Sequence, residues 1–386
     1  MATLEKKNKG IVTPYFDKKT TNIIKGIALI FMFIHHMFTF PEAYIEGISY
    51  PALEPYARWL CNPFNMCVSL FAFLTGYCYF FVKAKTFKYA FRKITDILFT
   101  YWVIYGVLLV VALSLGSYRD ITVKAFVMEL FALNRIVMVF CWYVPFYIMS
   151  MLILTFVTRH IEDNRIKEFF FLLVVPVLVT AVLSEFAGNS VISGNLRNIS
   201  EWFPCMAVGY LCASGAVFQN IFDRMLKLVK WKAARLCICF FLATSVFLLR
   251  HYVPKVTLIT FSLAGHPISV SIFADIIYAP IFIYATVNIL RILKLNAIYN
   301  VIGEIGKYSL YMWFFHCIFF NVSQNVFQPI LYFPRNPILV ILWGLLLCYG
   351  VSRLLALPIK KLLDFKERCI NYFFYENKRR GLNAKI

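Results

Sequence analysis

The residues of this sequence that are best placed to do chemistry lie inside its first long apolar stretch. Lys25 and His36 are eleven residues apart there. On a helix, that spacing returns to within about 20° of the same face and covers about 16 Å. We therefore expect one groove with Lys25 at its mouth and His36 near mid-membrane, where a neutral imidazole could act as a general base. His35 lies about 80° away and is expected to face a neighbouring helix, so a purely structural role for both histidines stays open.

A second candidate histidine, His316, lies in another apolar stretch. It follows Lys307 by nine residues. On one continuous helix, nine residues place two side chains on opposite faces, so the groove of the first helix is not expected to be repeated. Four further charged residues lie within or beside apolar stretches and are interpreted first as structural ion pairs: Glu201, Asp275, Glu304 and Arg353.

Membrane-spanning helices must position these residues, because the composition excludes a soluble fold. Of the 386 residues, 61% are apolar and only 15% are charged. That much apolar surface cannot be buried in a soluble domain of this size, and it also excludes disorder. The apolar stretches lack the strict alternation of a β-barrel, so we predict an all-α polytopic bundle. It would have about ten spans, with nine or eleven left open: Ile23–Phe40, Pro63–Val82, Ile94–Leu115, Phe140–Thr158, Phe169–Glu185, Glu201–Phe218, Leu236–Leu249, Ile268–Leu290, Tyr308–Phe327 and Ile338–Pro358. The short stretch Val256–Ala264 is interpreted as a re-entrant or outer-face segment.

The formal net charge of +20 would suggest a nucleic-acid partner on a soluble protein, but here it indicates topology. With ten spans and a cytoplasmic N-terminus, 30 of the 39 Lys and Arg fall on the inner side and eight on the outer side. We therefore expect both termini in the cytoplasm, and no nucleic-acid partner. The predicted divisions are a cytoplasmic segment 1–22, a transmembrane domain 23–358 and a basic cytoplasmic tail 359–386. The tail is interpreted as an amphipathic helix on the inner leaflet or as an ordinary basic tail. The eleven cysteines form no Cys-x-x-Cys pair, and no metal site is expected.

Five local motifs, in order along the chain, resemble those of the acyltransferase-3 family of integral membrane proteins. Lys25 and His36 match its basic residue, ten intervening residues and histidine. The other four matches are Phe71–Tyr77 for F-x-L-S-G-Y with Thr75 at the usual serine, Cys141–Pro145 for H-x-W-[YF]-L, Phe203–Leu211 for P-x-F-x-x-G, and Ile305–His316 for G-x-x-S-x-x-x-Y-L-x-H. The resemblance covers most of the chain, from residue 22 to about residue 320.

This resemblance implies transfer of an acetyl or other acyl group from acetyl-CoA to a hydroxyl of a cell-surface or lipid-linked saccharide, in the cell membrane. Acetyl-CoA would be a donor substrate rather than a tightly bound cofactor. His36 would act as general base or carry the acyl group briefly. Inner-surface cations would hold the CoA phosphates: Lys25, Lys88 and Arg92. Four residues are candidates to contact the acceptor or to support the site: His35, Trp142, Tyr143 and His316. An aromatic belt at the membrane surface is an equal interpretation of Trp142 and Tyr143.

One departure from the family pattern concerns the cytoplasmic start of the third span. The family carries Arg-x-x-Arg there, whereas Arg92 is followed by Lys93 and then by Thr95 and Asp96. The phosphate-binding role is therefore expected to be shared among Lys88, Arg92 and Lys93. Two other classes stay open, a flippase or transporter of lipid-linked saccharides and a non-catalytic membrane sensor. A transporter would be expected to show internal repeats or broken helices in matched positions, and none is found in the sequence.

Overall fold

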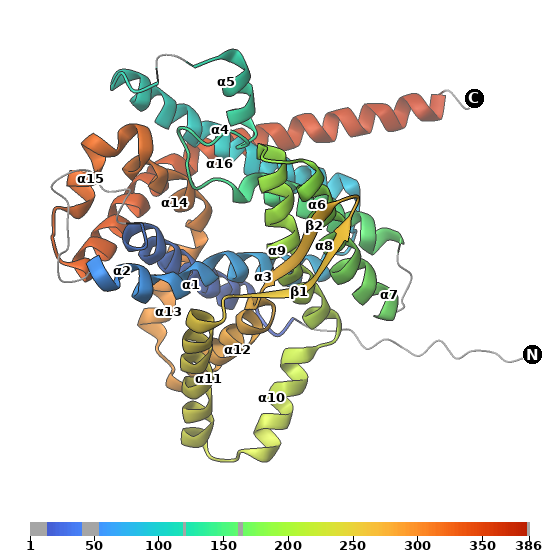
Figure 1. Cartoon of the computed structure of the whole chain (residues 1–386), viewed down its shortest axis with the longest axis vertical. Coiled ribbons are helices and arrows are strands. Elements are labelled where there is room, and N and C mark those ends of the chain that lie inside the picture. The colour runs from blue at the N-terminus through green and yellow to red at the C-terminus, as the bar shows by residue number, and fades with distance from the viewer. Residues whose placement is uncertain (1–13, 41–53, 119–120, 161–164, 384–386) are drawn as a thin grey trace, which may run out of the picture.

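The computed structural model describes residues 14–40, 54–118, 121–160 and 165–383, and these form a helical bundle (Figure 1). The first thirteen residues of the predicted N-terminal segment and the last three of the predicted tail lie outside the described residues. The first eight helices are α1 (Lys18–Phe38), α2 (Glu54–Cys61), α3 (Cys67–Phe80), α4 (Phe87–Ser114), α5 (Val123–Leu130), α6 (Tyr143–His160), α7 (Arg165–Phe169) and α8 (Val175–Phe186). The other eight are α9 (Val191–Ser214), α10 (Val217–Leu228), α11 (Lys232–Tyr252), α12 (Asp275–Leu293), α13 (Asn296–Lys307), α14 (Ser309–Phe315), α15 (Gln324–Tyr332) and α16 (Pro337–Asn383).

Within the described ranges, seven helical segments are long and apolar enough to cross a membrane, and the number is eight if the pair α9 and α10, bent by 61°, forms one span. Two of the ten predicted spans are not among them. The predicted span Phe140–Thr158 corresponds to α6, whose 18 residues include Arg159 and His160. The predicted span Tyr308–Phe327 is divided among α14, two 3₁₀ turns (His316–Phe319 and Asn321–Ser323) and α15. The count of about ten spans and the cytoplasmic position of both termini stay predictions.

A β-hairpin departs from the predicted all-α fold. Strands β1 (Lys255–Leu263) and β2 (His266–Phe273) pair antiparallel, and the turn between them places Ala264 and Gly265 at φ values of 51° and 82°. The segment Val256–Ala264, interpreted as re-entrant or on the outer face, thus consists of β1 and the first turn residue, and its place relative to the membrane stays a prediction. The start of the predicted span Ile268–Leu290 is wrong, because α12 begins only at Asp275. The physical reason is the alternation of β-branched residues, which favours a half-buried strand over a helix. The alternating side chains of β2 that are buried pack against α8: Ile268, Val270 and Ile272.

Two helix crossings in the centre of the bundle depend on glycine. A Cβ added to Gly306 of α13 would lie 1.7 Å from the Asn22 carbonyl oxygen of α1, and one added to Gly76 of α3 would lie 1.8 Å from the Met206 carbonyl oxygen of α9. Only glycine permits backbones to approach this closely. The crossings fix α1 against α13 and α3 against α9. Of these helices, α1, α3 and α13 contribute residues to the site described below.

The last helix, α16, passes without a break through Pro358, the last residue of the predicted transmembrane domain. It is 47 residues long, and in Figure 1 its end extends away from the bundle. Part of this extension is docked, because Arg92 of α4 forms an ion pair with Glu367 at 3.2 Å. The segment that follows the predicted transmembrane domain therefore contacts the start of α4.

Candidate active site

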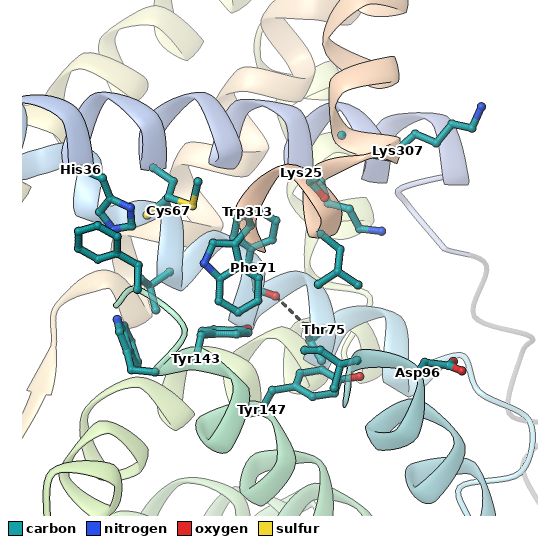
Figure 2. A pocket seen from close by; sticks show the side chains of 18 of the residues that line it. Lys25, His36, Cys67, Phe71, Thr75, Asp96, Tyr143, Tyr147, Lys307 and Trp313 are labelled. Carbon is teal, nitrogen blue, oxygen red and sulfur yellow. Dashed lines mark hydrogen bonds between the residues drawn. The ribbon is translucent and has the colours of Figure 1, made fainter. Parts of the chain in front are cut away.

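A cavity of about 390 Å³ runs between α1, α3, α4, α6 and the α13–α14 region (Figure 2). His36 lies at one end, and Lys25 and Asp96 lie at the other. Lys25 and His36 are thus on one face of α1, and both line the cavity. The geometry of a single continuous helix is sufficient for this arrangement. The rise of the helix places the Lys25 and His36 positions about 16 Å apart along this cavity.

The helix that carries both residues begins at Asp17. Its carboxylate accepts a hydrogen bond of 2.7 Å from the backbone N–H of Thr20, as an N-cap does. Hydrogen bonds from the Thr20 side chain and backbone lower the pKa of Asp17 below its usual value. The capped start and the close crossing at Gly306 fix the position of α1, and therefore the position of Lys25 and His36.

The imidazole of His36 contacts the ring of Phe140 and the imidazole of His316. Its ring stacks on Phe140, with centroids 3.9 Å apart and planes 13° apart. Its Nδ1 lies 2.8 Å from Nε2 of the fully buried His316. Nδ1 of His316, in turn, hydrogen-bonds to the carbonyl oxygen of Trp313.

This chain of contacts determines where the protons lie when both imidazoles are neutral. A carbonyl oxygen only accepts, so Nδ1 of His316 carries the hydrogen and Nε2 of His316 has the lone pair. Nε2 of His316 must then accept a hydrogen bond from Nδ1–H of His36. The remaining nitrogen of His36, Nε2, is left unprotonated, which is the form that a general base requires.

The position of His316 differs from what helical spacing predicts. Lys307 and His316 are not on one helix, because α13 ends at Lys307, the chain turns at Tyr308 and α14 follows. The nine-residue argument for opposite faces fails at this break. Lys307 lines one end of the cavity, and His316 reaches His36 from the other side of the break.

The second histidine of α1 faces away from the cavity. His35 is 6% exposed, and its Nδ1 lies 3.0 Å from the Thr39 hydroxyl and 3.4 Å from the Cys61 carbonyl oxygen. Cys61 is the last residue of α2, so His35 contacts a neighbouring helix, as its offset on α1 predicts. His35 is not among the residues that line the cavity.

Only some of the residues predicted to bind phosphate form the cationic end of the cavity. Lys25, Lys93 and Lys307 line it together with Asp96. Lys88 and Arg92 are not among the lining residues. The Arg92 side chain instead binds Glu367 and Asn371 of α16. The signal in the sequence was the spacing of Lys93, Asp96 and Ile97, which puts these three residues on one face of α4.

Aromatic side chains form part of the cavity wall. Trp142 and Tyr143 both line the cavity, and so do Tyr147 of α6 and Trp313 of α14. The rings of Tyr143 and Trp313 pack edge to face, with centroids 5.6 Å apart. Thr75 of α3, which replaces the serine of the family motif, also lines the cavity, and its hydroxyl donates to the Phe71 carbonyl oxygen at 2.8 Å. Tyr147 and Trp313 were not singled out from the sequence.

A buried carboxylate orders the segment that brings Phe140 onto His36. Glu129 is 0% exposed and lies just before the connection between α5 and α6. It accepts hydrogen bonds from the hydroxyls of Tyr105 and Tyr118, at 3.0 and 2.6 Å, and from the backbone N–H groups of Ile136 and Val137, at 2.5 and 2.9 Å. Burial raises the pKa of Tyr118, as does the neighbouring carboxylate, so its hydroxyl stays protonated and donates. A lone acidic residue has no spacing that would identify this role in advance.

Nothing in the described parts of the chain brings three or more His, Cys, Asp or Glu side chains close enough to hold a metal ion.

Comparison with known proteins places the chain in a family. No curated protein and no solved structure matches it. The acyltransferase domain of the acyltransferase-3 family matches residues 20–357, which include all but the first two residues of α1, all of α2 to α15 and the apolar half of α16. The seven described segments that are long and apolar enough to cross a membrane lie in or overlap this region. The chain therefore belongs to the acyltransferase-3 family and is an integral membrane acyltransferase.

Proposed function

We propose that this protein transfers an acetyl or other acyl group from acyl-CoA to a hydroxyl of a cell-surface or lipid-linked saccharide in the cell membrane, with His36 as general base. The observation that carries the proposal is the single cavity with three lysines at one end and His36 at the other. A CoA thioester has the same polarity, with phosphates at one end and the acyl group at the other.

The donor would enter at the cationic end. Lys25, Lys93 and Lys307 are the cavity residues that can bind the phosphates, which cannot enter hydrocarbon. Because Lys88 and Arg92 do not line the cavity, we propose that Lys93 and Lys307 take the role first expected of them. The flexible pantetheine arm is long enough to extend from these lysines toward His36 and bring the thioester carbonyl beside the imidazole.

The acyl transfer then depends on which ring nitrogens of His36 and His316 carry a hydrogen. Nε2 of His36 takes the proton of the acceptor hydroxyl while that oxygen attacks the thioester carbonyl carbon. The tetrahedral intermediate collapses, the carbon–sulfur bond breaks, and the proton held on His36 passes to the departing CoA sulfur. His316 keeps the Nδ1–H of His36 bound throughout, so that Nε2 is the nitrogen that exchanges the proton. The acceptor sugar would lie against Trp142, Tyr143 and Trp313.

The test is His36→Ala, assayed by transfer of labelled acetyl from acetyl-CoA to glycans of membranes that contain the protein. We expect activity to be abolished while the amount of inserted protein is unchanged. His160→Ala, which removes an exposed histidine of α6, is the matched control and is expected to keep full activity. Full activity in His36→Ala would remove His36 from the reaction, and movement of lipid-linked saccharide without consumption of acetyl-CoA would favour a transporter.

The same preparation distinguishes direct transfer from an acyl-histidine intermediate. With labelled acetyl-CoA and no acceptor, an intermediate would label the unchanged protein and leave His36→Ala unlabelled. Direct transfer, which we favour, would label neither.

A further inference from the structure

We propose that Lys366, which lies in α16 beyond the family-matched region, sets the charge of the donor end of the cavity by neutralising Asp96. This inference rests on the proposed function, because it concerns how that site accepts the phosphates of CoA. Lys366 does not line the cavity, so it acts through Asp96 as a positioning residue.

The first observation is an acidic group in a place that should be basic. Asp96 lines the cationic end of the cavity with Lys25, Lys93 and Lys307. Figure 2 shows Asp96 and Lys25 at this end. An uncompensated carboxylate there would repel phosphates. Asp96 also forms an ion pair with Lys93, at 3.2 Å, and so engages one of the cations that should bind the donor.

The second observation is the burial of Lys366. This side chain is 4% exposed, and its ammonium group forms an ion pair with Asp96. The same ammonium lies 3.5 Å from the Thr95 hydroxyl and 3.1 Å from Glu367. Lysine is rarely buried unless it is paired, because removing the ammonium group from water costs several kcal/mol. The contact with Asp96 is therefore specific, rather than a chance meeting of surface charges.

The third observation is the way in which α16 is held at this position. Glu367, the neighbour of Lys366, binds Arg92 at 3.2 Å, one turn before Asp96 on α4. Arg92 also donates to Asn371, one turn further along α16. The two helices therefore present their charges in register, and Lys366 faces Asp96. The residue first expected to bind CoA thus serves to align the cation that neutralises the site.

The experiment measures binding of CoA to the full-length protein in lipid nanodiscs. Lys366→Gln is expected to weaken CoA binding about tenfold, the effect of one unbalanced charge several ångströms from a phosphate at a partly wet surface. Pantetheine, which lacks the phosphates, is the second probe and is expected to bind Lys366→Gln as it binds the unchanged protein. Lys366→Arg keeps the charge and is expected to keep most of the affinity for CoA.

A double variant keeps the test decisive if Lys366→Gln folds poorly. Lys366→Gln with Asp96→Asn removes both charges and is expected to restore CoA binding to within about twofold of the unchanged protein. Lys361→Gln makes the same change at an exposed position of α16 and is the matched control, with no expected effect.

Three results would overturn the inference. They are an unchanged affinity for CoA in Lys366→Gln, an equal loss of affinity for CoA and pantetheine, and a double variant as weak as Lys366→Gln. Failure of the proposed function is seen separately, in the unchanged protein, as an absence of acetyl transfer from acetyl-CoA. The ratio of CoA affinities among the variants decides only the role of Lys366.

Discussion

Replacing Glu129 with glutamine is expected to loosen the segment that covers His36. The carboxylate of Glu129 accepts four hydrogen bonds, two from phenol hydroxyls and two from backbone N–H groups. A carboxamide of the same shape has one accepting oxygen, which can take two of these bonds. Its NH₂ group would face the remaining donors. The substitution therefore tests whether the charge and the acceptor count of Glu129, rather than its volume, order the segment.

The magnitude follows from the hydrogen bonds that cannot be remade. If the amide oxygen keeps both backbone N–H groups, the two tyrosine hydroxyls must turn and accept from NH₂ instead of donating. A hydrogen bond to a charged group contributes about 1.5–3 kcal/mol, and the turned hydroxyls recover part of that. We expect a net loss of about 2–4 kcal/mol in the free energy of unfolding, borne mostly by residues 131–142. Because Phe140 stacks on His36 from this segment, the turnover number should fall as well.

The assay compares melting temperatures in detergent and turnover in membranes. Glu129→Gln should lower the melting temperature by roughly 5 °C. The matched control is Glu185→Gln, the same chemical change at a partly exposed carboxylate whose ion pair with Arg197 is 3.6 Å long, and it should cost less than about 1 kcal/mol. Equal melting temperatures for the two variants would refute the reasoning. So would a destabilised Glu129→Gln that keeps its full turnover number, because the segment would then not position Phe140 for the reaction.

Two further predictions concern the helices that hold the site. Gly76→Ala should lower the free energy of unfolding by at least about 3 kcal/mol, because the added Cβ would meet the Met206 carbonyl oxygen. The recovery of monodisperse protein measures this loss. Gly106→Ala, whose added Cβ has nothing within 4 Å, should be recovered like the unchanged protein. Asp17→Ala should destabilise the start of α1 by about 1 kcal/mol, while Asp17→Asn, also a good cap, should cost less. Since folding lowers the pKa of Asp17, its charged form stabilises the helix above about pH 4, and that contribution is lost as the pH falls through the lowered pKa. Melting curves at pH 6 and pH 3 should therefore show a larger acid-induced loss for the unchanged protein than for Asp17→Asn, and equal losses would contradict the capping role.

The parts of the site that were predictable depend on one uninterrupted helix. Lys25 and His36 line one cavity because the periodicity of α1 fixes their directions, and the same rule turns His35 toward α2. The rule fails for His316, since the chain turns at Tyr308 and no periodicity crosses that break. The contact with His36 is made beyond this break, at the 3₁₀ turn that begins at His316.

The remaining errors arise from contacts between distant segments. Arg92 forms an ion pair with Glu367 of α16, more than 270 residues later in the chain, while Lys93 lines the cavity. Most of β2 was included in the predicted span Ile268–Leu290 because its apolar content was counted, while the alternation of Ile, Ser and Val that indicates a strand was not. Glu129 offered no pattern at all, because four donors from separate segments converge on it only in the folded chain.

The length of α16 gives an independent measure of depth in the bilayer. From Pro337 to Lys366 the helix rises about 44 Å, whereas the hydrocarbon layer is about 30 Å thick. Even at a tilt of about 40°, the projected rise is about 34 Å, which exceeds that thickness. If Pro337 starts near one face of the membrane, Lys366 and the Asp96 that it binds must stand at or beyond the opposite face. A water-borne nucleotide would then reach the three lysines of the cavity without crossing any lipid, and only its acyl arm would have to enter the membrane.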